Sequence, residues 1–138
     1  MWNKILTGRD VTELMKKFGQ FHDSCIREFR YISGAFVDKD LAMHADDDVR
    51  VVTIVFQRQA LELMSIEVEF SELVRLNLEP CEARYSCEIF EATMFIEKDL
   101  VYWGSSGDFA TKREHYRGTW LCAGKARWRA LEFTDFED

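Results

Sequence analysis

Three consecutive polar residues, His22, Asp23 and Ser24, carry the groups in this sequence that are best suited to catalysis. An imidazole titrates near neutral pH, a carboxylate can fix its tautomer, and a hydroxyl can act as a nucleophile. Adjacent residues of an extended chain point to opposite sides, however, and no Gly-x-Ser-x-Gly elbow exposes the serine. We therefore interpret the cluster as structural. A small enzyme that uses His22 and Asp23, with His115 brought near by the fold, is the alternative.

In the structural interpretation, the three residues stabilise the chain where a helix ends and a strand begins. Short polar side chains commonly hydrogen-bond the backbone groups that a helix end leaves unpaired. We expect Asp23 or Ser24 to make such a bond and His22 to pack on an aromatic neighbour.

A second candidate site is the segment 104–118, which holds three glycines and little apolar periodicity. It lacks the Lys-Ser/Thr of a phosphate-binding P-loop. Loops longer than ~12 residues are uncommon in compact domains and are often functional. We predict a protein-binding loop here; a plain solvent-exposed connection is the alternative. The candidate binding residues are Asp108, Phe109, His115 and Tyr116.

The cysteines and acidic residues do not form a metal-binding pattern. No Cys-x-x-Cys pair occurs, the histidines are scattered, and Asp46 to Asp48 lack the ligand offsets of a calcium loop. We expect neither a metal nor another cofactor. Without a secretory signal, free thiols in a reducing cytoplasm are expected at all four cysteines. These are Cys25, Cys81, Cys87 and Cys122.

The chain is acidic, with 18 basic and 25 acidic side chains and a net charge of -7. Such a charge repels nucleic acid and anionic lipid, whereas it favours a basic protein partner. The simpler interpretation is that the negative charge only keeps the protein soluble. No apolar run approaches the ~20 residues that span a bilayer, and no signal peptide is recognisable. We therefore expect a cytoplasmic protein that binds neither nucleic acid nor membrane.

One N-terminal helix is predicted from local patterns. Its apolar residues recur at the spacing of a single helical face: Val11, Leu14, Met15 and Phe18. Asp10 followed by Glu13 has the form of a capping box, Lys16 and Lys17 suit the last turn, and Gly19 ends the helix.

The remainder predicts strands joined by short connections. Val51–Phe56 is β-branched on both faces, which is typical of a central strand. Residues 64–70 alternate, and the pattern continues to Leu78 either through a bulge near Glu72 or after a turn near Ser71. The other expected strands are 25–33, 87–97, 100–103 and 120–130, with a hairpin turn at Lys98-Asp99. The Asp-rich segment 37–49 is predicted to be a solvated connection.

In the last strand, apolar residues are expected on one face and basic residues on the other. The apolar set is Trp120, Cys122, Ala126, Trp128 and Ala130, and the basic set is Lys125, Arg127 and Arg129. We expect the basic set to pair with Glu67 and Glu69 across strands. An acidic ligand is the alternative partner for the basic stripe.

These elements predict one domain over residues 1–138, of the α+β class and mainly β. The architecture is an antiparallel sheet or a two-layer sandwich of about six to eight strands with one N-terminal helix, because no helical crossover separates the strands.

Phe21–Ile26, Tyr31–Asp38 and Gly118–Trp120 together resemble an uncharacterised family of small bacterial cytoplasmic proteins over most of the chain. This resemblance implies a fold and no catalytic residues. The His-Asp-Ser motif is also similar, over a few residues, to some immunity proteins of bacterial toxin systems. That second likeness implies an acidic protein that neutralises a basic toxin.

The leading functional hypothesis is a non-enzymatic interaction module that binds a protein through its acidic surface and the segment 104–118. A small enzyme and an oligomerising scaffold are the alternatives.

Overall fold

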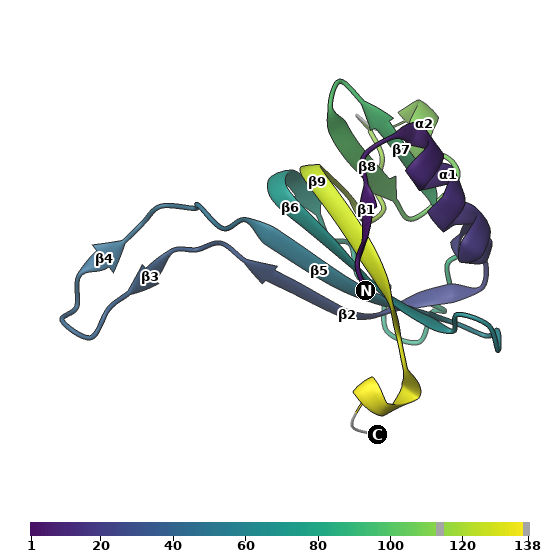
Figure 1. Cartoon of the computed structure of the whole chain (residues 1–138), viewed down its shortest axis with the longest axis horizontal. Helices are drawn as coiled ribbons and strands as arrows, with labels where there is room; N and C mark the ends of the chain where they lie inside the picture. Colours follow the sequence, from purple (N-terminus) through teal and green to yellow (C-terminus); the bar gives the residue numbers. More distant parts are fainter. Residues whose placement is uncertain (113–114, 137–138) are drawn as a thin grey trace.

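The computed structural model describes residues 1–112 and 115–136, and in these ranges the chain forms a seven-stranded and a two-stranded antiparallel sheet (Figure 1). The larger sheet has the order β2-β5-β6-β9-β8-β7, with β1 beside β9. This confirms the predicted class, mainly β with an N-terminal helix. The strands of the large sheet are β1 Asn3–Ile5, β2 Ser24–Ile32, β5 Val51–Arg58, β6 Ser65–Asn77, β7 Thr93–Glu97, β8 Leu100–Gly104 and β9 Trp120–Leu131.

The small sheet pairs β3 Phe36–Val37 with β4 Met43–His44, at the end of a long projection that leaves the body between β2 and β5 (Figure 1). The segment predicted to be a solvated connection is therefore an ordered β hairpin. There are two short 3-10 turns: Gly19–Phe21 precedes β2, and Phe133–Asp135 follows β9. No helix in the described ranges is long and apolar enough to cross a membrane.

Helix α1, Gly8–Lys17, buries the predicted apolar face. Its N-cap is Thr7, whose side chain accepts from the Asp10 amide while the Asp10 carboxylate accepts from the Thr7 amide at 3.0 Å. The capping box is thus Thr7–Asp10, and the predicted Asp10–Glu13 box was wrong. Both pairs have the required spacing of three, but only Thr7 lies directly before the first helical residue.

The main core lies between α1 and the large sheet, where aromatic side chains meet edge to face. The ring of Phe21 contacts Phe18, Phe56 and Trp103, with centroid separations of 5.0, 4.9 and 5.8 Å. All four side chains are fully buried. Strand β5 lies between β2 and β6, as its β-branched composition predicted.

Strands β6 and β9 form a long pair whose faces invert midway. Glu72 has a φ of 54°, and it lies in the register opposite Gly124. Phe70 and Leu73 therefore both face the main core, although their spacing in a regular strand puts them on opposite faces. The continuous strand with an irregularity near Glu72 is confirmed. Continued alternation up to Leu78 would put Val74 on the inward face; this part of the prediction was wrong, since Val74 is exposed.

The same inversion divides β9. Leu121 and Ala123 join the main core with the later residues Ala126 and Trp128. Trp120 and Cys122 pack in a second cluster around Phe109, on the other face of the sheet. The single apolar face predicted for this strand was therefore wrong before Gly124.

The predicted cross-strand charge pairs are present for Arg127 and Arg129, whereas Lys125 lies opposite Ser71. Arg127 and Arg129 donate to the carboxylates of Glu69 and Glu67, at 2.9 and 2.8 Å. The ring of Trp2 lies over both guanidinium groups, 4.1 and 4.6 Å from its centroid. The two arginines therefore make the expected pairs with carboxylates of this chain itself.

The connection between β7 and β8 is the predicted two-residue turn, with Lys98 and Asp99 both at positive φ. Only residues 93–97 of the predicted strand 87–97 join the large sheet. The preceding stretch makes one isolated bridge, between Ile89 and Ser24.

Candidate functional site

The predicted cluster lies in a tight turn between α1 and β2. Gly19, Gln20, Phe21 and Asp23 all have φ between 56° and 61°, a conformation that is unusual for a bulky residue such as phenylalanine. The turn directs the Phe21 ring into the core. Its geometry therefore has a structural purpose.

Ser24 stabilises this turn. Its buried hydroxyl donates to the Phe21 carbonyl oxygen at 2.6 Å. The Arg58 guanidinium adds a second link by donating to the Lys17 carbonyl oxygen at 3.1 Å. The bond that the sequence predicted for Asp23 or Ser24 is thus made by Ser24. A hydroxyl that is buried and already donating is poorly placed to attack a substrate.

His22 is an exposed side chain with hydrogen-bond acceptors at both ring nitrogens. Its Nδ1 donates to the Phe90 carbonyl oxygen at 2.6 Å, and its Nε2 lies 3.3 Å from Oδ2 of Asp23. The Phe90 carbonyl first, and the Asp23 carboxylate second, raise the pKa of His22 above its usual 6.5. Both acceptors favour imidazolium, the form that cannot act as a general base.

The other charges that raise the pKa of His22 are those of Glu88 and Glu91. His115, the third group of the enzyme alternative, is exposed on the segment 104–118. His22 was expected to pack on an aromatic neighbour. Instead, its imidazole hydrogen-bonds the Phe90 carbonyl oxygen and holds that segment beside β2.

The described parts of the predicted loop, residues 104–112 and 115–118, contain a helix and buried side chains. A short helix, α2 Phe109–Lys112, occupies part of it, and the Phe109 side chain is fully buried. Phe109 packs against Tyr116 and Trp120, each with a centroid separation of 5.3 Å. Phe109 is therefore part of the second core cluster and is not on the surface that a partner reaches.

The other predicted binding residues have different exposures. Tyr116 is half-buried and its hydroxyl lies 2.8 Å from Ser105 Oγ. Asp108 and His115 are exposed. The fold thus leaves two of the four predicted residues on the surface of this segment.

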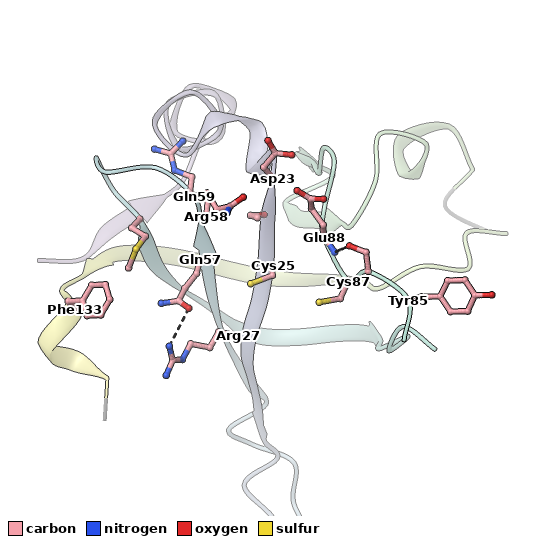
Figure 2. Close-up of a pocket in the computed structure, with 13 residues that line it drawn as sticks. Asp23, Cys25, Arg27, Gln57, Arg58, Gln59, Tyr85, Cys87, Glu88 and Phe133 are labelled. Atoms are coloured by element: carbon pink, nitrogen blue, oxygen red, sulfur yellow. Dashed lines mark hydrogen bonds between the residues drawn. The ribbon is translucent and has the colours of Figure 1, made fainter. Parts of the chain in front are cut away.

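A pocket of 740 Å³ adjoins the His22 turn (Figure 2). It is lined by the start of β2, the end of β5 and the stretch 85–88. Asp23 and Ser24 form part of its wall. Two cysteines, Cys25 on β2 and Cys87 on the stretch 85–88, supply its nucleophilic groups. Sequence reasoning missed this pair because the residues are far apart in the chain and no local motif joins them.

The projecting hairpin is the largest feature that sequence reasoning missed. We define the arm as residues 33–50. At its base the Ser33 carbonyl oxygen accepts from the amides of both Val49 and Arg50, at 3.1 and 3.0 Å. Gly34 has a φ of 102°, and a Cβ there would lie 2.8 Å from the Val49 nitrogen. Only glycine fits this position comfortably, and it fixes the direction of the arm.

The tip of the arm has its own hydrogen bonds. The Asp38 carboxylate accepts from the amides of Asp40 and Ala42, at 2.9 and 3.0 Å. The imidazole of His44 lies 2.9 Å from the same carboxylate. Together these contacts lower the pKa of Asp38 below its usual 3.8, with the His44 contact as the largest cause. The tip is therefore an ordered turn.

The arm exposes apolar side chains on both faces. Cross-strand partners share a face, so Val37 and Met43 lie together on one side, and Phe36 lies with His44 on the other. Phe36, Met43 and the tip residue Leu41 are 56%, 69% and 84% exposed. A sequence signal was present, since Phe36-Val37 and Met43-His44 flank a turn-forming Asp-Lys-Asp.

Carboxylates surround these apolar groups. The arm contains five aspartates against one lysine and one arginine: Asp38, Asp40, Asp46, Asp47, Asp48, Lys39 and Arg50. Because the arm stands away from the body (Figure 1), its negative charge is presented to whatever contacts the apolar residues.

No group of three or more histidine, cysteine or acidic side chains within the described ranges has the arrangement of a metal site. No family model, curated protein or solved structure matches this chain.

Proposed function

We propose that this protein is a non-enzymatic binding module that recognises a basic protein through its arm. The observation that carries the proposal is the exposure of Phe36, Leu41 and Met43 on an ordered hairpin outside the core. Large apolar side chains that are held in place and left uncovered are typical of an interaction surface. The hairpin replaces the segment 104–118 as the proposed binding element.

Charge selects the kind of partner. The aspartates of the arm favour an apolar groove bordered by lysine or arginine, because opposite charges steer association and discriminate against acidic surfaces. Neutralisation of a basic toxin by an immunity protein is one special case of this proposal. The His22 turn supports a non-enzymatic role, since Ser24 and His22 are both committed to backbone oxygens.

The proposal is tested by affinity capture with matched variants. The arm variant combines Phe36→Ser, Leu41→Ser and Met43→Ser. The control variant combines Leu61→Ser and Phe133→Ser, which remove exposed apolar side chains from the body. A protein retained by the native chain and the control, and lost with the arm variant, is then purified and its Kd is measured.

We expect the arm variant to weaken this Kd about a hundredfold or more, because a few central apolar residues dominate most interfaces. Binding should also weaken with added salt. An equal Kd for the native chain and the arm variant would contradict the role of the arm. A native chain that sediments as a dimer, with the arm variant monomeric, would instead assign the arm to self-association.

A further inference from the structure

Cys25 and Cys87 both line the pocket beside the His22 turn, Cys25 on β2 and Cys87 on the neighbouring stretch 85–88 (Figure 2). Backbone contacts hold these two segments together. The Ile89 amide donates to the Ser24 carbonyl oxygen at 2.7 Å, and His22 bonds the Phe90 carbonyl oxygen. Cys25 directly follows the acceptor residue Ser24, and Cys87 precedes the donor residue Ile89 by two positions. The bridge between Ser24 and Ile89 therefore keeps the two thiols near each other, although they are far apart in the sequence.

We propose that Cys25 and Cys87 form a thiol–disulfide modification site, which takes a low-molecular-weight disulfide as its oxidant and closes as an intramolecular disulfide across the pocket. The site is independent of the arm and of the proposed binding function. Closure ties the stretch 85–88 to β2.

The two thiols differ in a way that sets the order of reaction. Cys87 is exposed, and Figure 2 shows its side chain directed towards β2. Cys25 is half-buried, and burial first, then the neighbouring Cys87, raise the pKa of its thiol. Since the thiolate is the attacking species, the accessible Cys87 reacts first with an oxidant from solution.

With oxidised glutathione, the Cys87 thiolate attacks one sulfur, forms a mixed disulfide and releases one glutathione thiolate. The Cys25 sulfur then rotates about χ1, away from the Gln57 backbone that it contacts, towards Cys87. As a thiolate it attacks the Cys87 sulfur, and the second glutathione leaves. Two protein thiols are oxidised, and one glutathione disulfide is reduced to two glutathione molecules.

The remaining cysteines are placed less well for this reaction. Cys122 is buried in the second core cluster. Cys81 is exposed, but its thiol contacts the Ser86 carbonyl oxygen at 3.5 Å and does not line the pocket. Cys81 is therefore the competitor that the experiment must separate from Cys25.

The test incubates the fully reduced protein with oxidised glutathione, counts its thiols and maps linked peptides by mass spectrometry. We expect the loss of two of the four thiols and a peptide pair joined through Cys25 and Cys87. Dithiothreitol should restore both thiols.

Three variants complete the test. Cys25→Ser should stop at one glutathione on Cys87, and Cys87→Ser should keep the Cys25 thiol reduced. The matched control Cys81→Ser should form the same disulfide as the native chain. A Cys81–Cys87 link, a stable glutathione adduct on the native protein, or four unreacted thiols would each overturn the proposal.

Discussion

The imidazole of His44 stacks on the ring of Phe36 across the arm, with 4.4 Å between the ring centroids and 6° between the ring planes. The same imidazole contacts the Asp38 carboxylate that closes the tip. One side chain therefore links the apolar surface of the arm to its turn.

We expect the tip to lose order in acid. The pKa of Asp38 is lower in the folded arm than its usual 3.8, so its stabilising effect is present above pH 3.8 and is lost as the pH falls through the lowered value. Carboxyl carbon shifts and exchange of the Ala42 amide measure this by NMR. His44→Ala should move the pKa of Asp38 upwards. A native Asp38 that titrates at or above 3.8 would contradict the observed contacts.

His22 should give the opposite pH dependence at the helix-to-strand turn. Its pKa is raised in the folded state, so its contribution is fully present below pH 6.5 and is lost as the pH rises through the folded value. Exchange of the Ile89 amide should therefore quicken with rising pH in the native protein, beyond the chemical base effect, and not in His22→Ala. Asp23→Asn is the matched variant: the pKa of His22 should fall but stay above 6.5, because the Phe90 carbonyl is the larger cause.

Ser24→Ala should destabilise the fold. Removal of the buried hydroxyl deprives the Phe21 carbonyl of its 2.6 Å donor, and such losses typically cost about 1–3 kcal/mol in the free energy of unfolding. Urea denaturation measures the change, with the exposed Ser86→Ala as a control expected to be near neutral. Unchanged stability of Ser24→Ala would argue against Ser24 as the residue that stabilises the turn.

Glu72 and Gly124 should be energetically coupled. A Cβ at Gly124 would lie 3.1 Å from the Glu72 Cβ and 2.7 Å from its Oε2, so Gly124→Ala should destabilise the protein. Glu72→Gly removes the crowding side chain. It also relieves the cost of the left-handed conformation at this position, which is about 1–2 kcal/mol for a non-glycine residue. The double variant should therefore be more stable than the sum of the two single changes implies. Additive changes in urea denaturation would exclude this coupling.

The parts of the fold that sequence patterns predicted correctly depend on short-range regularities. The apolar face of α1, the Lys98-Asp99 turn and the central place of β5 each follow from residues close together in the chain. The prediction of which residues share a strand face was wrong beyond Glu72, because a positive φ at a residue other than glycine leaves no mark in the hydrophobic pattern. The predicted N-cap was wrong because Thr7–Asp10 and Asp10–Glu13 have the same spacing of three residues.

The candidate sites follow the same division. The role of Ser24 was predictable from its position after a helix, since such serines bond nearby carbonyl groups. Phe109 was misjudged because its burial depends on Tyr116 and Trp120, which only the folded chain brings around it. The exposure of Phe36 was equally beyond a sequence pattern, which cannot distinguish an apolar residue in the core from one held in solvent.

The separation of the arm from the core has an evolutionary consequence. The side chains of Val37, Leu41 and Met43 are exposed and lie outside the main core cluster, so folding of the body hardly restrains their replacement. Under the proposed function, descendants of this chain can change what they recognise while keeping the same scaffold, and grafting the hairpin from one to another should transfer the preference with it.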